Sequence, residues 1–368
     1  MKVKVNQKEL SKAVGTVQKA ITSKTTLPIL NGILIETKKN KLKLTGTDLE
    51  IGIETYIDCE VIESGTIVIP SKIFGDIIRK LPNLDIVIEV NDDNKVHISC
   101  GHSDFNILGQ PAMEYPELPK INDDISFKIP KDLLKNMIRQ TVFAAAQDEI
   151  KPILTGALLE VNNGKASLVA LDGYRLAVKT TSIDCNNDIK VVIPSKTLNE
   201  VNKILEDDDS DVTIMFTSSH VLFDLGHSVI ISRLLEGEFI NYKDIIRNEY
   251  KSRVKVKTKD IQESIERASL LAREGKNNLV KFDISDEGMT ITSNSDIGNV
   301  VENIDIDLEG NDIKIGFNSK YILDAIRVID SEEIYMNLVS SVNPCIIKPV
   351  DDDSYTYLVL PVRLIEEA

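Results

Sequence analysis

The sequence lacks the features that most often reveal an enzyme, a secreted protein or a membrane protein. It contains no tryptophan, and only 5% of its residues are aromatic. Its four cysteines, Cys59, Cys100, Cys185 and Cys345, are scattered without a CxxC pair, so neither a disulfide framework nor a thiolate metal site is expected. The apolar runs are strand-length, far short of the roughly 20 residues that a membrane-spanning helix needs. These absences predict a cytoplasmic protein with reduced thiols.

Motifs for catalysis and for cofactor binding are also missing. The histidines, none with ligand-like spacing, are His97, His102, His220 and His227. No GxxxxGK[ST], GxGxxG or GxSxG motif occurs. The acidic stretches at 206–211 and 351–353 lack the pattern of a calcium-binding loop and are interpreted as solvated turns. We therefore expect no catalytic residue, no metal site and no cofactor.

The chain contains an internal repeat. Three turns with an aspartate, each after a strand, lie 124 residues apart at Asp48, Asp172 and Asp296. The same spacing relates two glycines that begin strands and three Ser-Lys pairs that begin helices, namely Gly32 and Gly156, Ser71-Lys72, Ser195-Lys196 and Ser319-Lys320. Coincidence among common strand patterns is the alternative. The repeat predicts an α+β protein of three similar domains, each with two helices and antiparallel sheets, at 1–120, 121–248 and 249–368.

Six amphipathic helices are predicted from apolar residues at helical spacing. Their approximate ranges are 7–21, 71–81, 130–142, 195–205, 259–273 and 319–329. The net charge of the chain is −15, which by itself argues against binding to phosphate. The helices nevertheless carry about +8 in total, although 259–273 contributes nothing. If they share one face, that face would bind phosphates without reading bases; ordinary solvated lysines are the alternative.

The turn after Asp172 is the most distinctive stretch of the sequence. Asp172 and Arg175 could form a catalytic pair, which gives one hypothesis, an enzyme. At the corresponding positions of the other repeats the aspartate remains, whereas Ile51 and Asn299 stand in place of the arginine. The aspartate is therefore interpreted as a turn former that accepts backbone hydrogen bonds.

Five stretches together resemble one known family. They are Thr26–Leu30, Leu44–Glu50, Leu171–Ala177, Val192–Lys196 and Leu358–Leu364. The whole chain resembles the bacterial DNA sliding clamps, the β subunits of DNA polymerase III. The resemblance implies a non-catalytic, head-to-tail homodimer, a six-domain ring with helices inside and sheet outside. Such a ring encircles double-stranded DNA at the nucleoid, so its hold on DNA is topological and weak phosphate contacts suffice.

The resemblance also implies a pocket for short apolar peptides of partner proteins. These partners are the replicative polymerase α subunit, the clamp loader, other polymerases and repair factors. The matching positions are Leu154, Leu171, Gly173, Tyr174, Arg175, Leu176, Ile240, Ile245, Val342, Leu358, Val359, Leu360, Pro361, Val362 and Arg363. The sequence departs from the familiar residues at Tyr174, Ile240 and Asp244, and it adds the tail Ile365–Ala368.

Two further sets of residues follow from the same matching. Residues expected to face DNA are Lys24, Lys72, Arg79, Lys131, Lys135 and Lys196. Residues expected at the dimer seam are Phe105 and Ile107 of one protomer and Leu270 and Leu271 of the other, with burial inside a domain as the alternative. A further hypothesis is a scaffold that binds proteins through the groove without encircling DNA.

Overall fold

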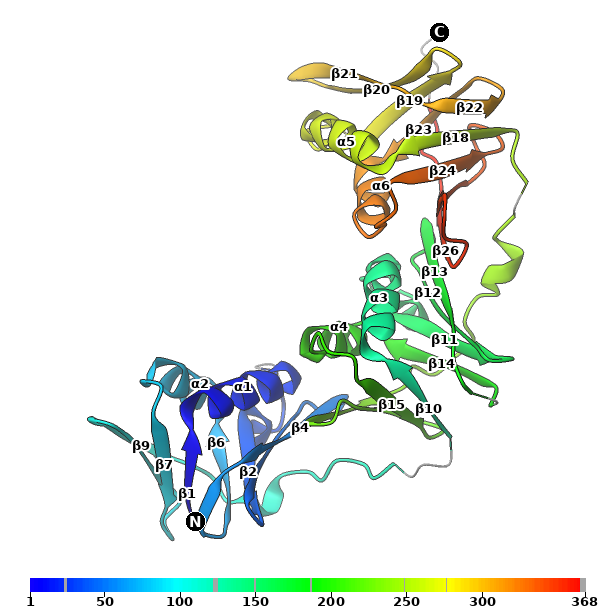
Figure 1. Cartoon of the computed structure of the whole chain (residues 1–368). Coiled ribbons are helices and arrows are strands. Elements are labelled where there is room, and N and C mark those ends of the chain that lie inside the picture. Colours follow the sequence, from blue (N-terminus) through cyan, green and yellow to red (C-terminus); the bar gives the residue numbers. More distant parts are fainter. Residues whose placement is uncertain are drawn as a thin grey trace. The chain divides into compact units, whose positions relative to one another are not determined.

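The computed structural model describes residues 1–22, 25–121, 125–148, 150–185, 187–247, 249–275 and 277–364. The chain, whose elements are labelled in Figure 1, divides into two compact units. Unit 1 comprises residues 1–132 and 200–234, and unit 2 comprises residues 133–199 and 235–368. The middle third of the sequence therefore contributes to both units.

Six α-helices lie in the described residues, as the periodic patterns predict. They are α1 (Gln7–Val17), α2 (Ser71–Lys80), α3 (Lys131–Thr141), α4 (Ser195–Ile204), α5 (Thr258–Ala272) and α6 (Ser319–Ile326). Local capping helps to set two of the starts, because the side chains of Asn6 and Asn318 accept hydrogen bonds from the backbone two residues on. In unit 1, α1 packs beside α2, and in unit 2, α5 packs beside α6 (Figure 1).

The strands of the described residues are short, and their pairs are antiparallel. Those of unit 1 are β1 (Lys2–Asn6), β2 (Gly32–Lys38), β3 (Lys41–Thr47), β4 (Ile51–Asp58), β5 (Glu60–Glu63), β6 (Thr66–Pro70), β7 (Asp85–Val90), β8 (Lys95–Cys100), β9 (Ser103–Leu108), β10 (Ser126–Pro130), β15 (Asp211–Phe216), β16 (His220–Asp224) and β17 (Ser228–Arg233). Those of unit 2 are β11 (Gly156–Asn162), β12 (Lys165–Leu171), β13 (Arg175–Ser182), β14 (Ile189–Pro194), β18 (Ser252–Lys257), β19 (Leu279–Ser285), β20 (Gly288–Ser295), β21 (Gly298–Ile304), β22 (Asp307–Gly310), β23 (Ile313–Asn318), β24 (Glu333–Leu338), β25 (Cys345–Pro349) and β26 (Tyr355–Val359).

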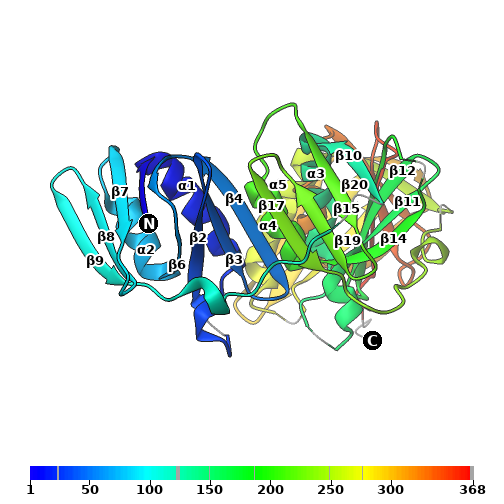
Figure 2. The ribbon, with the colours of Figure 1, turned by 90° about the horizontal axis from the view of Figure 1, so that it is seen from below.

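Among the described residues, each unit holds two sheets. Unit 1 has a five-stranded sheet in the order β5-β1-β7-β8-β9 and an eight-stranded sheet in the order β10-β15-β16-β17-β4-β3-β2-β6. Figure 2 shows β7, β8 and β9 as neighbours in the smaller sheet. Unit 2 has a nine-stranded sheet in the order β14-β11-β12-β13-β26-β25-β24-β18-β22 and a four-stranded sheet in the order β21-β20-β19-β23.

The larger sheets explain why the middle third of the chain is shared. In unit 1, β17 from the middle third pairs with β4 from the first third. In unit 2, β26 from the last third pairs with β13 from the middle third. Each of these two joints therefore continues one sheet across two repeats.

Some outer strands are covered at one point by a neighbouring segment. Single β-bridges join β6 to Gln110, β14 to Leu235 and β23 to Val362. Within the described residues, no such bridge lies along β9 or β21. These two strands therefore keep backbone groups on their outer edges unpaired by other strands.

The repeated aspartates are equivalent at two of the three turns. The Oδ1 atoms of Asp48 and Asp172 each accept backbone hydrogen bonds from residues two and three positions on, which confirms the turn-forming role. In the third hairpin Ser295 pairs with Gly298, so Asp296 is itself the first residue of the two-residue loop. The spacing of 124 residues is thus shifted by one at the third turn.

Candidate binding groove

A row of cross-strand neighbours runs over one face of the nine-stranded sheet. Leu171 lies opposite Leu176, which lies opposite Leu358, and the row continues to Ile346 and Asn337. Directly opposed residues of adjacent strands project to the same face. All five side chains are at least nine-tenths buried. The row gives unit 2 an apolar floor that ends in an amide.

A cavity of about 310 Å³ opens above the far end of this row. Its lining comprises Asp244, Ile245, Arg247, Glu249, Asn337, Val339, Asn343, Pro344, Ile346 and Leu358. Aliphatic side chains and a proline form much of the wall, whereas three charged residues come from the segment at 244–249. The arrangement suits an apolar group presented by a chain that also carries polar atoms.

The predicted pocket residues separate into a buried set and an exposed set. The buried residues are Leu154, Leu171, Leu176, Leu358 and Val359. The exposed or partly exposed residues are Gly173, Tyr174, Ile240, Ile245, Val342, Leu360, Pro361, Val362 and Arg363. Leu154, Leu171, Leu176 and Leu358 belong to one apolar cluster, against which the linker residues Phe239 and Tyr242 also pack. The structure therefore brings buried members of the predicted set together as a floor.

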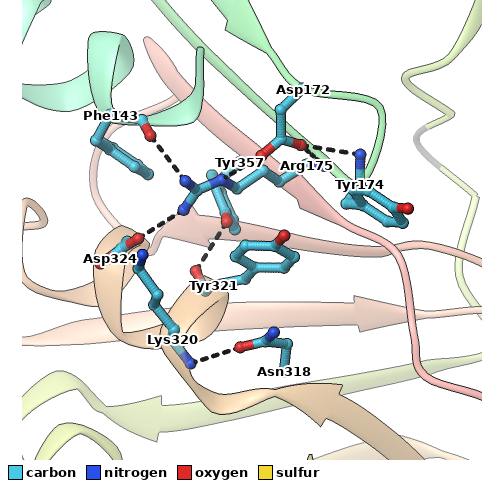
Figure 3. Close-up of polar contacts among 9 residues, drawn as sticks. All are labelled: Phe143, Asp172, Tyr174, Arg175, Asn318, Lys320, Tyr321, Asp324 and Tyr357. Atoms are coloured by element: carbon cyan, nitrogen blue, oxygen red, sulfur yellow. Dashed lines mark hydrogen bonds and ion pairs between the residues drawn. The ribbon is translucent and has the colours of Figure 1, made fainter. Parts of the chain in front are cut away.

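Tyr174 stands at the exposed tip of the β12–β13 hairpin. Its backbone N–H donates to Asp172, and its carbonyl oxygen accepts a hydrogen bond from the backbone N–H of Leu360 at 2.8 Å. The preceding Gly173 has φ of +91°, a conformation that favours glycine. The Tyr174 ring is 62% exposed and stacks on that of Tyr321, with ring centroids 6.3 Å apart (Figure 3). The tip thus presents an aromatic surface.

The side chain of Arg175, which the resemblance places in the pocket, points away from solvent. Its side chain is 6% exposed, and the residue is not among those that line the cavity. Nε donates to Asp172 at 3.0 Å and Nη1 to Asp324 at 2.6 Å, while Nη2 donates to the carbonyl oxygen of Phe143 at 2.8 Å (Figure 3). The guanidinium also lies over the Tyr321 ring, 4.5 Å from its centroid. Arg175 therefore connects the hairpin to α6.

The charge state of this cluster follows from its surroundings. Burial alone would lower the pKa of Arg175, but the carboxylates of Asp324 and Asp172 outweigh it and raise that pKa. Burial raises the pKa of Tyr357 well above its ordinary value, and the neutral hydroxyl donates to the carbonyl oxygen of Tyr321 at 2.8 Å. Each of the three guanidinium nitrogens of Arg175 thus donates a hydrogen bond, which suits a structural role.

The segment that carries Ile240 and Ile245 is attached to the sheet through Glu160. Between them lies a short 3₁₀ helix, Tyr242–Asp244. The carboxylate of Glu160 accepts a hydrogen bond from the hydroxyl of Tyr242 at 2.9 Å and lies 2.8 Å from Nζ of Lys243. Burial would raise the pKa of Glu160, but the bonds from Lys243 and Tyr242 outweigh it and lower that pKa.

The residues expected to face DNA differ in their surroundings. Lys24 lies outside the described residues, as does the tail at 365–368. Lys72 and Lys196 are exposed, and Lys135 is half-buried. Arg79 is exposed and pairs with Asp76 at 2.6 Å. Lys131 is only 5% exposed and pairs with Asp208 at 2.8 Å, so its charge is held within unit 1 and the expected contact with DNA is not favoured.

The four residues expected at a dimer seam retain solvent exposure. Phe105 on β9 is 38% exposed and Leu270 on α5 is 64% exposed. Ile107 and Leu271 are each partly exposed. Complete burial inside a domain, the alternative for these residues, therefore does not hold.

In the part of the chain that the structure describes, no group of three or more histidine, cysteine, aspartate or glutamate residues could hold a metal ion. No described helix is both long enough and apolar enough to cross a membrane.

Sequence reasoning missed several residues of the groove. Asn337, Pro344 and Ile346 line the cavity, and Tyr321 and Asp324 hold the hairpin tip. The alternation of Ile334, Met336 and Leu338 indicates a strand, and Asn337 then falls on its other face. The identity of its cross-strand neighbours required the register of the sheet.

Comparisons with known proteins agree along the whole chain. Family models described as the DNA polymerase III beta subunit match residues 1–119 (N-terminal domain), 128–241 (central domain) and 243–363 (C-terminal domain). A beta sliding clamp of Staphylococcus epidermidis and one of Staphylococcus aureus are each 40% identical over 356 residues, covering 94% of both chains.

Solved structures are similar over nearly the full length. A DNA polymerase sliding clamp from Bacillus subtilis has 39% identity and a TM-score of 0.96, over 99% of this chain and 100% of that one. A sliding clamp from Pseudomonas aeruginosa, solved bound to griselimycin, has 28% identity and a TM-score of 0.94 at the same coverage.

Proposed function

This chain belongs to the family of the DNA polymerase III beta subunit and has the function of a DNA sliding clamp, and from this we propose how it performs that function. It forms a head-to-tail homodimeric ring of six domains that encircles double-stranded DNA in the cytoplasm, at the nucleoid. Its three domains are those expected at 1–120, 121–248 and 249–368. The ring tethers the polymerase α subunit, the clamp loader, other polymerases and repair factors, and it catalyses no reaction.

The groove of unit 2 is the proposed site for partner peptides. The observation that carries this proposal is the buried row from Leu171 to Ile346, which leads into a cavity edged by charged residues. In the same unit, Tyr174, Val342 and Leu360 remain exposed although they are apolar or aromatic. An apolar floor with exposed anchors and a polar edge is typical of sites that take short peptides.

The repeat supports a third joint, formed between two copies of the chain. The first helices of the three repeats begin at Gln7, Lys131 and Thr258. The residues at the same distance after these starts are Lys19, Phe143 and Leu270, which are therefore equivalent. Within unit 1, Lys19 lies 3.8 Å from Glu200 across a joint of the repeats. Within unit 2, Phe143 lies across the other joint from Tyr357, with ring centroids 5.9 Å apart. The third equivalent, Leu270, is free to meet a second copy.

Strand pairing at the two joints predicts the pairing at the seam. Matching the hairpin loops makes β9 equivalent to β17 and β21 equivalent to β4. Because Ile230 pairs with Ile53, we expect Phe105 to lie opposite Val300 of a second copy. Joining the five-stranded and four-stranded sheets in this way gives nine strands, the size of the large sheet in unit 2. Such a contact joins two different surfaces, so two copies arranged head to tail can close a ring.

A titration with griselimycin tests the groove. The Pseudomonas aeruginosa relative was solved with this ligand, and we propose that it binds the groove of unit 2 here. The change Ile245→Asp places a charge at a cavity-lining side chain that is 38% exposed and should weaken binding by about tenfold or more. Ile62→Asp, at an exposed position of unit 1, is the matched control. If Ile245→Asp and Ile62→Asp bound griselimycin with equal affinity, the groove would not be the binding site.

Retention on DNA tests the ring. After loading by a clamp loader, the protein should stay on nicked circular DNA and leave when the circle is cut, because its hold is topological. Protein retained on the linear form would contradict a sliding ring. Charge reversal at Lys72 and Lys196 together should shorten polymerase tracts; unchanged tracts would favour the scaffold that never encircles DNA.

A further inference from the structure

Asn337 is the polar member of the row that floors the groove. It lies opposite Ile346 on one side and opposite Arg253 on the other. Its side chain is 8% exposed and lines the cavity beside Pro344 and Val339. A buried amide among apolar neighbours costs free energy unless its donors and acceptor are bonded. The hydrogen bonds of the Asn337 amide therefore indicate which kind of ligand the cavity can bind.

Arg253 fixes the orientation of this amide. Nε of Arg253 donates to Oδ1 of Asn337 at 3.0 Å. The guanidinium is itself held over two aromatic rings, 3.9 Å from the centroid of Tyr250 and 4.9 Å from that of Tyr335. Since an arginine can only donate, the amide atom that faces it must be the oxygen. The Nδ2 group, with its two N–H donors, is thereby turned away from Arg253.

The donors of Asn337 have no acceptor among the described residues of the protein. Of its amide atoms only Oδ1 takes part in a hydrogen bond there. The neighbouring floor residues, Ile346 and Leu358, offer only apolar side chains. An acceptor for Nδ2 must then come from solvent or from a molecule in the cavity.

The equivalent row of unit 1 lacks this polar pair. It runs through Thr47, Gly52, Ile231, Leu222, Met215 and Ser126. Met215 stands where unit 2 has Asn337, and Ser126 stands where it has Arg253. Since the same sheet pairing forms without them, the amide and its arginine are not required by the repeated fold. They are particular to the unit that carries the groove.

Resting on the proposed function of the groove, we propose that Nδ2 of Asn337 donates a hydrogen bond to a carbonyl oxygen of the bound partner peptide. Arg253 is the positioning residue that keeps Nδ2 directed at the ligand. A ligand that offered only hydrocarbon at this point would cover the N–H groups and leave them unpaired. The cavity therefore selects an apolar anchor that is accompanied by a carbonyl group, as a peptide backbone provides.

Substitution of Asn337 tests the donor. The probe is a fluorescein-labelled synthetic peptide of about nine residues with leucine anchors, titrated against the full-length protein. Asn337→Leu keeps the branched shape of the side chain but removes the donor and should weaken binding by about fivefold to tenfold. Asn337→Asp keeps the bond from Arg253 but presents an oxygen to the carbonyl, so it should weaken binding further. Asn162→Leu, at the exposed end of β11, is the matched control and should bind as the wild type does.

Backbone esters in the probe locate the acceptor. Replacing single amides of the peptide by esters weakens the carbonyl oxygen as an acceptor. One ester position should reduce affinity for the wild type and have no effect with Asn337→Leu. Arg253→Met should reduce affinity in the wild-type background but add no loss in the Asn337→Leu background. A purely structural role of Arg253 would instead give additive losses.

The outcomes separate this inference from the proposed function. If the wild type binds the probe and Ile245→Asp weakens it, while Asn337→Leu binds as tightly as the wild type, the groove stands and the donor is refuted. If the wild type does not bind the probe, or Ile245→Asp has no effect, the groove and the donor both fall. Thermal unfolding midpoints of the variants identify any loss that comes from misfolding.

Discussion

At the scale of single residues, Tyr174 and Arg175 are neighbours in sequence but have opposite roles. Tyr174 is 62% exposed at the hairpin tip, whereas Arg175 is 6% exposed and bonds to Asp172 and Asp324. The position of the exposed hairpin tip thus depends on the bonds of a buried side chain.

Arg175→Ala is expected to destabilise the protein. It leaves Asp172 and Asp324 without their buried cation, and removing one member of a buried ion pair costs about 3–5 kcal/mol. Chemical denaturation of the wild type and the variant measures the difference in free energy of unfolding. Tyr174→Ala is the matched control, because it should weaken peptide binding while leaving stability nearly unchanged. If Arg175→Ala lost affinity for the peptide but not stability, Arg175 would instead be a residue that contacts the peptide.

Glu160→Gln is expected to change how stability depends on pH. The pKa of Glu160 is lowered from its ordinary 4.5 in the folded protein, so its contribution is present above that value and is lost as pH falls through the folded pKa. At pH 7 the variant should be less stable by about 1.5–3 kcal/mol, the range for a hydrogen bond to a charged group. Thermal unfolding at pH 7 and near pH 3 should show the difference narrowing at low pH. A difference independent of pH would contradict this account.

The sequence could predict the identity of many site residues but not their exposure. Leu171, Leu176 and Leu358 match the family motif and do lie together. Lys131 matches as well, yet it is buried against Asp208, because its place on α3 brings it beside the acidic loop after α4. Asn337 has no motif at all. Burial depends on the register of the strands and on neighbours that are distant in the sequence. The pattern of residues along the chain reveals neither of these.

At the scale of elements, the helices were the most predictable part of the fold. The apolar spacing at 71–81 predicts α2 almost to the residue, since burial at intervals of three and four follows from helix geometry. The shift of the third hairpin loop by one residue was not predictable. Its alternation fits either register, and only the pairing of Ser295 with Gly298 decides between them.

The pairing of β9 with β21 of a second copy is expected to have a defined register. Because Ser228 pairs with Thr55 within unit 1, Ser103 should face Glu302 of the partner subunit. The double variant Ser103→Cys, Glu302→Cys should form an intersubunit disulfide on mild oxidation, detected as a covalent dimer by denaturing electrophoresis. Ser103→Cys with Asn303→Cys, slipped by one residue, is the control and should not cross-link. Efficient cross-linking of the slipped pair would refute the register.

At the scale of the whole molecule, the threefold repeat explains why the chain contains two similar joints between its domains. Two joints lie within the chain, and each continues a sheet from one repeat into the next. The family identity and the strand orders predict a third joint of the same kind. The spacing of 124 residues was visible in the sequence, but the sharing of the middle repeat between two units was not, because it depends on which edges pair.

Leu270→Asp is expected to separate the dimer without unfolding the chain. Leu270 is 64% exposed, so the charge is tolerated in an isolated protomer but would be buried at the proposed seam. Sedimentation equilibrium should give the 41.0 kDa of one chain in place of twice that value. Ile62→Asp, at an exposed position of β5, should leave the wild-type mass. A dimer that persisted in Leu270→Asp would exclude this residue from the seam.

The uncovered edges of β9 and β21 allow open polymers to form as well as a closed ring. In the proposed seam, the edge of β9 in one copy pairs with the edge of β21 in another copy. An open row of protomers therefore always has one unpaired β9 edge and one unpaired β21 edge, and only a closed assembly has neither. If the angle between successive protomers were altered, the same contacts would propagate into an open filament. A substitution that stiffens or re-aims a joint, far from either edge, could thus convert a closed assembly into a polymer whose length grows with protein concentration.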